Sequence, residues 1–123
     1  MKAFIINPNA GIKDMIQAKE IQNNLDTYYD IIGCRCIDIV HYPINGKNYD
    51  IIVDDEGLFV SNPVVTAVDK SGHPLLVGAL IITNYDGEGN ETDLEPGDVT
   101  RIASAIRCTV QGDRVIPVVI IDF

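Results

Sequence analysis

Residues 36–53 read CIDIVHYPINGKNYDIIV, and this stretch decides the fold of the chain. Two β-rich runs flank Asn45-Gly46, the strongest short-range signal for a β-hairpin, because both central residues of a type I′ turn have positive φ. A two-residue turn also fixes the strand register, which places Tyr42 opposite Tyr49. We therefore expect a hairpin whose tyrosine-bearing face lies toward the core.

The same register places His41 opposite Asp50 on the other face of the hairpin. A histidine beside a carboxylate could act as a general base with its orienting acid. No nucleophile can be assigned to this pair from the sequence, and cross-strand charge pairs routinely support sheets. The sequence favours an ordinary structural pair and predicts no catalytic residue.

Shorter patterns on both sides of the hairpin predict further strands and helices. Asn62-Pro63 is typical of a helix start, since proline lacks only an amide hydrogen that would be unpaired there. Residues 75–83 are continuously apolar, as expected of a strand in the middle of a sheet. The expected strands are 2–6, 15–21, 75–83, 108–110 and 115–123, and the expected helices are 23–33 with Asn23 as N-cap, 62–68 and 96–106.

These elements predict an α+β fold: one mixed, mostly antiparallel sheet of about five to seven strands, packed by two or three short helices. At 123 residues, with 46% apolar and 22% charged residues, the chain has the composition of one globular domain spanning residues 1–123. The N-terminal apolar run is too short for a signal peptide, and no stretch is long enough to cross a bilayer. We expect a cytoplasmic protein.

The net charge of −9 limits the class of partner. Nucleic acids and anionic membranes bind proteins through lysine and arginine, so neither is an expected direct partner. A protein with a basic surface is the partner that an acidic chain suits best. The sequence gives no oligomeric state.

Acidic residues gather in two stretches. No lysine or arginine occurs between Ser71 and Thr100, and a second cluster follows residue 53. If both stretches share one face, they could imitate the phosphates of a nucleic acid in the basic groove of a partner, although charge runs usually only face water. The candidate partner-binding residues are Asp54, Asp55, Glu56, Asp86, Glu88, Glu91 and Asp93.

Two other patterns suggest a small-ligand or metal-binding domain as an alternative. Residues 84–95 partly match a calcium loop, with Gly89 at the sixth position, but Asn84 replaces the usual first carboxylate. Cys34 and Cys36 are two apart in an apparent strand, yet they lack the spacing of a structural zinc site. The simpler expectation is a solvated loop and buried, reduced cysteines, with no metal and no cofactor.

Four segments follow one another in a recognisable order: Tyr29–Cys34, Ile51–Leu58, Asn62-Pro63 with Thr66-Ala67, and Leu76–Ile82. Together they resemble the domain of unknown function 3846 family. The resemblance runs from about residue 21 to residue 106 and implies an accessory protein of a phage or other mobile element of Gram-positive gut bacteria. It carries over no catalytic residue.

From the sequence we expect a non-enzymatic, acidic binding protein that modulates a host or element protein. The sequence has no phosphate-binding loop, metal-ligand set or glycine-flanked nucleophile. The alternatives are a small-ligand or calcium-binding domain and an enzyme without a recognisable motif.

Overall fold

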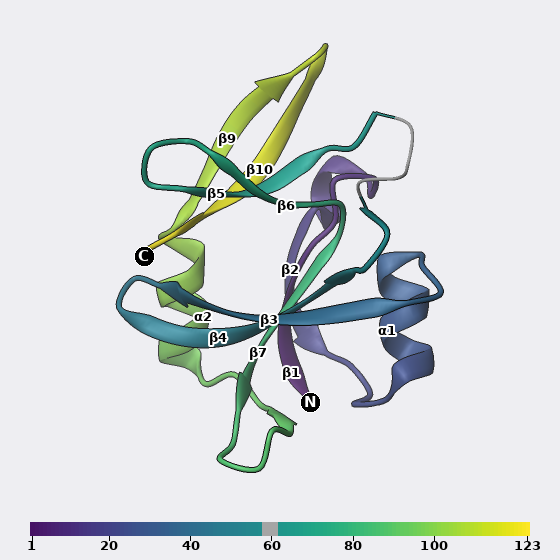
Figure 1. The fold of residues 1–123 in the computed structure, drawn as a ribbon, viewed down its shortest axis with the longest axis vertical. Coiled ribbons are helices and arrows are strands. Elements are labelled where there is room, and N and C mark those ends of the chain that lie inside the picture. The colour runs from purple at the N-terminus through teal and green to yellow at the C-terminus, as the bar shows by residue number, and fades with distance from the viewer. Residues whose placement is uncertain (58–61) are drawn as a thin grey trace.

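The computed structural model describes residues 1–57 and 62–123 (Figure 1). In chain order its elements are β1 (Lys2–Ile6), the 3-10 helix η1 (Ile12–Asp14), β2 (Ile16–Glu20), α1 (Leu25–Ile32), β3 (Ile37–Ile44), β4 (Lys47–Asp54), β5 (Val65–Asp69), β6 (Pro74–Val77), β7 (Leu80–Tyr85), β8 (Glu91–Thr92), α2 (Pro96–Ala103), β9 (Ile106–Gln111) and β10 (Arg114–Ile121).

The strands form two sheets, whereas the sequence predicted one. Sheet A has the order β2-β1-β7-β4-β3, with β8 paired to β7, and sheet B has the order β6-β5-β10-β9. Every pairing is antiparallel except that of β5 with β10. The mostly antiparallel α+β class is therefore confirmed, and the single sheet is corrected to two.

The central hairpin has the predicted register. Tyr42 lies opposite Tyr49, and the turn residues Asn45 and Gly46 have φ of 48° and 85°. Tyr49 is fully buried, so the tyrosine face is the core face, as predicted. The turn residues thus fix the pairing register of β3 and β4, the two longest strands of sheet A.

The predicted helix at 62–68 is wrong. Val65–Asp69 is strand β5, and Asn62 has a left-handed φ of 55°, which is not the extended geometry of a helix N-cap. The segment VTAV is rich in β-branched residues, and parallel pairing of Ala67 with Val119 outweighs the local start signal.

The apolar run 75–83 is two strands and not one. Gly78 has a φ of 77°, a conformation that side chains disfavour, and the chain there leaves β6 in sheet B and enters β7 in sheet A. The central position predicted for this run holds for β7, which lies between β1 and β4.

The two α-helices have well-defined ends. Asn24, and not Asn23, caps α1 by accepting a hydrogen bond from the backbone of Thr27, and Gly33 closes the helix at φ 76°, as predicted. In α2, Pro96 stands in the first turn and a capping box joins Glu95 to Asp98. Residue 106, expected at the end of this helix, begins β9 instead.

Sheet A is covered on both faces. One face packs with sheet B and α2 around a core that includes Ile51, Ile82 and Val119, and the other packs against α1 through Ile5, Ile52 and Ile81. In the described part of the chain, no helix is both long and apolar enough to cross a membrane.

Candidate functional site

Asp50 is a buried acid in the middle of sheet A. It lies on β4 between His41 of β3 and Thr83 of β7, and only 2% of its surface is exposed. The Nδ1 atom of His41 lies 2.5 Å from Oδ1 of Asp50, which confirms the predicted cross-strand pair. Burying a carboxylate is costly, so this position calls for an explanation beyond strand pairing.

Glu91 meets Asp50 from the β7–β8 hairpin. It lies opposite Tyr85, two residues after Thr83, and therefore on the same face of sheet A as Asp50. Burial, together with the contact with Asp50 and the negative charges of Asp50 and Asp86, raises the pKa of Glu91 to about 7. We call Asp50, Asp86 and Glu91, with the adjacent His41, the carboxylate cluster.

Aromatic side chains surround the carboxylate cluster. The ring of Tyr85 packs edge-on against His41, with 5.0 Å between ring centroids. Tyr28 of α1 donates a hydrogen bond to Asn23, whose amide in turn donates to the backbone oxygen of Glu91. Burial, with a smaller effect of the Glu91 charge, raises the pKa of Tyr28 to about 12, so this phenol stays protonated.

The cluster is incompletely satisfied within the described residues. The hydroxyl of Thr83 is buried without a hydrogen-bond partner, and the buried Oδ1 of Asp50 makes no hydrogen bond beyond its ion-pair contact with His41. Unsatisfied buried polar groups are rare in folded proteins, and acids with raised pKa values concentrate at functional sites. Chemically, such a group of residues can hold a cation or pass a proton.

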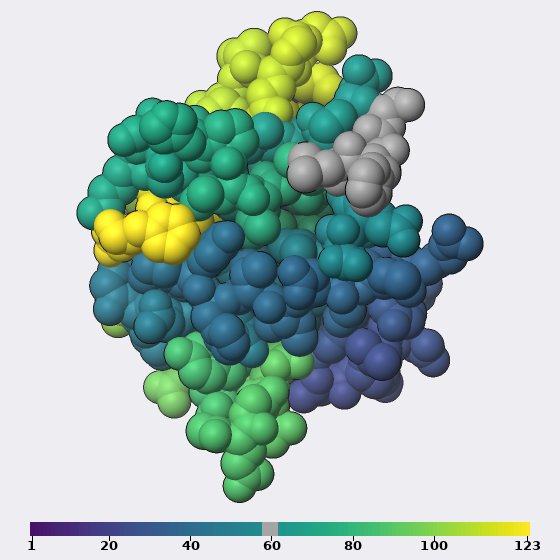
Figure 2. Space-filling model, viewed as in Figure 1, coloured from purple at the N-terminus to yellow at the C-terminus, as the bar shows by residue number. Residues whose placement is uncertain are grey.

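The two acidic stretches do not form one patch. Because β4 and β7 are antiparallel with Asp50 opposite Thr83, Asp54 lies at the end of sheet A where β7 begins, and Asp86 lies where β7 ends. About 20 Å of strand separates them. In Figure 2 the green 84–92 segment projects at the lower end of the molecule. The two acidic stretches therefore lie at opposite ends of sheet A and do not form one compact patch.

Within each stretch the carboxylates differ in what they contact. Asp86 accepts hydrogen bonds from the backbone of Glu88 and Asn90, which hold its pKa below the usual range and order the hairpin tip. Asp93 accepts from the backbone of Lys2. At the other end of sheet A, Oδ1 of Asp54 accepts from the backbone of Glu56, and Asp55 and Glu56 are exposed.

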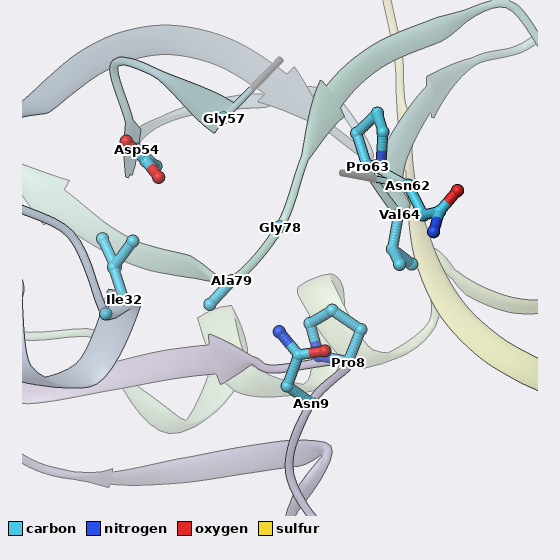
Figure 3. A pocket seen from close by; sticks show the side chains of 11 residues that line it. Pro8, Asn9, Ile32, Asp54, Gly57, Asn62, Pro63, Val64, Gly78 and Ala79 are labelled. Atoms are coloured by element: carbon cyan, nitrogen blue, oxygen red, sulfur yellow. The ribbon is translucent and has the colours of Figure 1, made fainter. Parts of the chain in front are cut away.

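A cavity of about 260 Å³ lies at the Asp54 end of sheet A (Figure 3). Asp54 and Ile32 lie on one side of it, and Asn62 to Val64 lie on the opposite side. Its lining includes Ile32-Gly33, Asp54, Gly57, Asn62-Pro63 and Gly78-Ala79. These residues belong to the segments that carry the family resemblance, so the fold gathers them at one place.

The calcium-loop pattern at 84–95 folds as a β-hairpin followed by the start of α2. Asn84, the expected first ligand, turns its amide group toward the carboxylate of Asp98, 2.7 Å away, and to the backbone oxygen of Asp93. The Nδ2 group of Asn84 thus joins β7 to Asp93 and to α2. Among the described residues, no group of three acids, cysteines or histidines is arranged to hold a metal.

The cysteines also differ from expectation. Cys34 and Cys36 lie in the connection between α1 and β3, outside any strand, and all three cysteines are free thiols. Cys36 and Cys108 are exposed, which corrects the expectation that all three are buried, and only Cys34 is partly covered. Burial and the nearby charge of Asp54 raise the pKa of Cys34, which disfavours its thiolate.

Sequence reasoning found the His41–Asp50 pair but missed what surrounds it. The contact of Glu91 with Asp50 depends on the β7–β8 pairing, which the calcium-loop interpretation concealed. The signal for that pairing was a glycine-bearing turn, residues 86–90, between Tyr85 and Glu91.

Comparison with known proteins gives a family without an assigned activity. No curated protein and no solved structure matches the chain. A family model described as Domain of unknown function (DUF3846) matches residues 1–107, most of the chain. The resemblance found in the sequence is thereby confirmed, and the chain belongs to the DUF3846 family.

Proposed function

We propose that this protein is a non-enzymatic binding protein that receives a positively charged side chain of a partner protein at the carboxylate cluster. In the setting that the family resemblance implies, the partner is a host or mobile-element protein with a basic surface. The observation that carries this proposal is the buried Asp50 beside Glu91, a concentration of negative charge at the base of an acidic hairpin.

The local charge balance supports a cation as the missing partner. Among the described residues, Lys47 pairs with Asp98 and Lys70 with Asp122, whereas no lysine or arginine pairs with the carboxylate cluster. The raised pKa of Glu91 comes first from burial and then from its contact with Asp50 and the negative charges of Asp50 and Asp86. An ammonium or guanidinium group placed there would favour the ionised form of Glu91 and gain a charge-assisted hydrogen bond.

The hairpin geometry supports a protein as the source of that cation. The β7–β8 hairpin projects from the body of the molecule, where a large partner can reach it (Figure 1). The hydrogen bonds that Asp86 receives from Glu88 and Asn90 fix the tip before binding. A preformed tip lowers the ordering cost of association. The cavity beside Asp54 supports the small-ligand alternative instead, at the other end of sheet A.

The test is binding of fluorescein-labelled octalysine, measured by anisotropy at low salt and at about 0.3 M NaCl. We expect Asp50→Asn/Glu91→Gln to weaken binding about tenfold or more, because it removes the charges that the cation meets. We also expect wild-type affinity to rise between about pH 6 and pH 8, since binding requires Glu91 to lose its proton.

The matched control, compared at pH 8 where Glu91 is mostly ionised, is Asp54→Asn/Glu56→Gln, which removes two carboxylates at the opposite end of sheet A. It should change the affinity by less than about threefold. Equal losses for the two double variants would mean that only net charge attracts the peptide, and the proposed site would be wrong. Binding that ignores both salt and pH would also contradict the proposal.

A further inference from the structure

We propose that a groove between the β9–β10 hairpin and the η1–β2 segment binds a small amphipathic molecule with an apolar chain and a single carboxylate. We call it the apolar groove; its lining is Ile12, Met15, Ile16, Cys108, Val115 and Pro117, with Arg114. It is separate from the carboxylate cluster, and the inference does not rest on the function proposed above.

The groove exists because the β9–β10 hairpin extends beyond its neighbour in sheet B. Pairing of β10 with β5 covers only Val119–Ile121, whereas pairing of β10 with β9 continues out to Arg114. Figure 1 shows this hairpin projecting at the top of the molecule. Val115 and Pro117 precede the core residue Val119 at alternate positions on one face of the strand, and the η1–β2 segment supplies the other side of the groove.

Exposed apolar side chains concentrate at this groove. Ile12 is 89% exposed, Val115 is 60% exposed and Ile16 is 41% exposed, and the 75% exposed Val110 lies directly opposite Val115 in the hairpin. Leaving contiguous apolar surface in water is unfavourable, and such patches mark binding sites in soluble proteins. The volume of about 500 Å³ lies within the range of small-molecule sites.

The positive charge of Arg114 favours a ligand with a negatively charged group. Its guanidinium donates a hydrogen bond to the backbone oxygen of Pro8, which holds it at the groove, and among the described residues no carboxylate lies within ion-pair distance of it. What distinguishes Arg114 from the other basic residues is its place, because it is the basic residue that lines the apolar groove in the described part of the chain. A guanidinium presents several donors in the planar arrangement that fits a carboxylate.

A second copy of this chain is a less suitable occupant. Each copy carries a net charge of −9, which opposes self-association, and one arginine per groove offers little compensation. A single carboxylate on an apolar chain instead satisfies the two features of the groove together. The apolar chain of such a molecule would cover the exposed apolar side chains of the groove, and its carboxylate would pair with Arg114.

The experiment is calorimetric titration of the whole protein with decanoate and, separately, with decylammonium, which has the same chain and the opposite charge. We expect decanoate to bind at one site and decylammonium to bind at least about tenfold more weakly. Arg114→Gln should weaken decanoate about tenfold and remove the preference between the two ligands, while Arg114→Lys should retain part of it. Arg35→Gln, a change at an exposed arginine outside the groove, should have no effect.

The comparison of the two ligands needs no variant, so a folding defect in Arg114→Gln cannot conceal the answer. Equal affinity for decanoate and decylammonium would reveal apolar adsorption only and would overturn the proposal. Absence of decanoate binding up to about 1 mM would do the same. So would light scattering that shows a dimer in wild type and a monomer in Ile12→Asn, because a second copy would then occupy the groove.

Discussion

Replacing Asp98 by alanine is expected to lower the free energy of unfolding by about 2–4 kcal/mol, because the change breaks a partly buried ion pair and its hydrogen bonds together. Asp98 lies on α2 and is 4% exposed. Its carboxylate accepts hydrogen bonds from Lys47 Nζ at 2.7 Å and from the fully buried Tyr49 hydroxyl at 2.8 Å. A further bond comes from Asn84 Nδ2 at 2.7 Å, so one side chain joins α2 to both central strands of sheet A.

The loss of stability is large because the substitution leaves two polar groups without their hydrogen-bond partner. Without the carboxylate, the Tyr49 hydroxyl stays buried with no acceptor, and Lys47 loses its partner. Urea unfolding measures the change, with Asp30→Ala on the exposed face of α1 as the matched control, for which we expect less than about 0.5 kcal/mol. A loss below about 1 kcal/mol in Asp98→Ala would show that the network does not hold α2 on the sheet.

The same carboxylate gives the fold an acid-sensitive component. Burial alone would raise the pKa of Asp98, but the hydrogen bonds from Lys47, the Glu95 amide, Tyr49 and Asn84 hold it well below its usual range. A depressed folded-state pKa means stability that is present above the ordinary aspartate pKa and is lost as the pH falls below about 4. Asp98→Asn should therefore flatten the acid limb of the stability curve.

The wild-type protein is expected to lose stability as the pH rises from about 5 to 8, and Glu91→Gln is expected to abolish this loss. The folded-state pKa of Glu91, about 7, lies above the ordinary value of 4.5. Its contribution is therefore fully present below about pH 4.5 and is lost as the pH rises through 7. Because Glu91 is partly exposed and solvent screens its charge, we expect a wild-type fall of only about 1–2 kcal/mol.

Urea unfolding at a series of pH values measures this fall. Glu88→Gln, at an exposed position in the same hairpin, is the matched control and should keep it. His41 pairs with Asp50 in the same cluster, so His41→Gln is the second variant. A fall that survives Glu91→Gln but disappears in His41→Gln would assign the pH dependence to the imidazole and contradict our account.

The elements that the sequence predicted well are those whose signals are local. Asn45-Gly46 set the register of β3 and β4, and with it the His41–Asp50 pair, because a type I′ turn leaves no choice of partner residues. Gly33 ended α1 for a similar reason, since few residues tolerate its backbone conformation. The positions of His41 and Asp50 in the carboxylate cluster follow from the first of these rules.

The elements that the sequence did not predict depend on long-range pairing. Val65–Asp69 is a strand because it pairs with β10, and the local sequence of the segment does not indicate this pairing. The left-handed turn at Gly78 splits one apolar run between two sheets, which periodicity cannot reveal. The burial of Asp50 beside Glu91, and the approach of η1 to Arg114, require contacts between segments 41 and about 100 residues apart in the chain.

The most direct test of the carboxylate cluster is the titration of Glu91 itself, followed by NMR of its side-chain carboxyl carbon in the free protein and with octalysine bound. We predict an apparent pKa near 7 in the free protein and a fall toward 4.5 with the peptide. A value near 4.5 already in the free protein, unchanged by the peptide, would contradict the claim that Asp50 and Glu91 form a site for a cation.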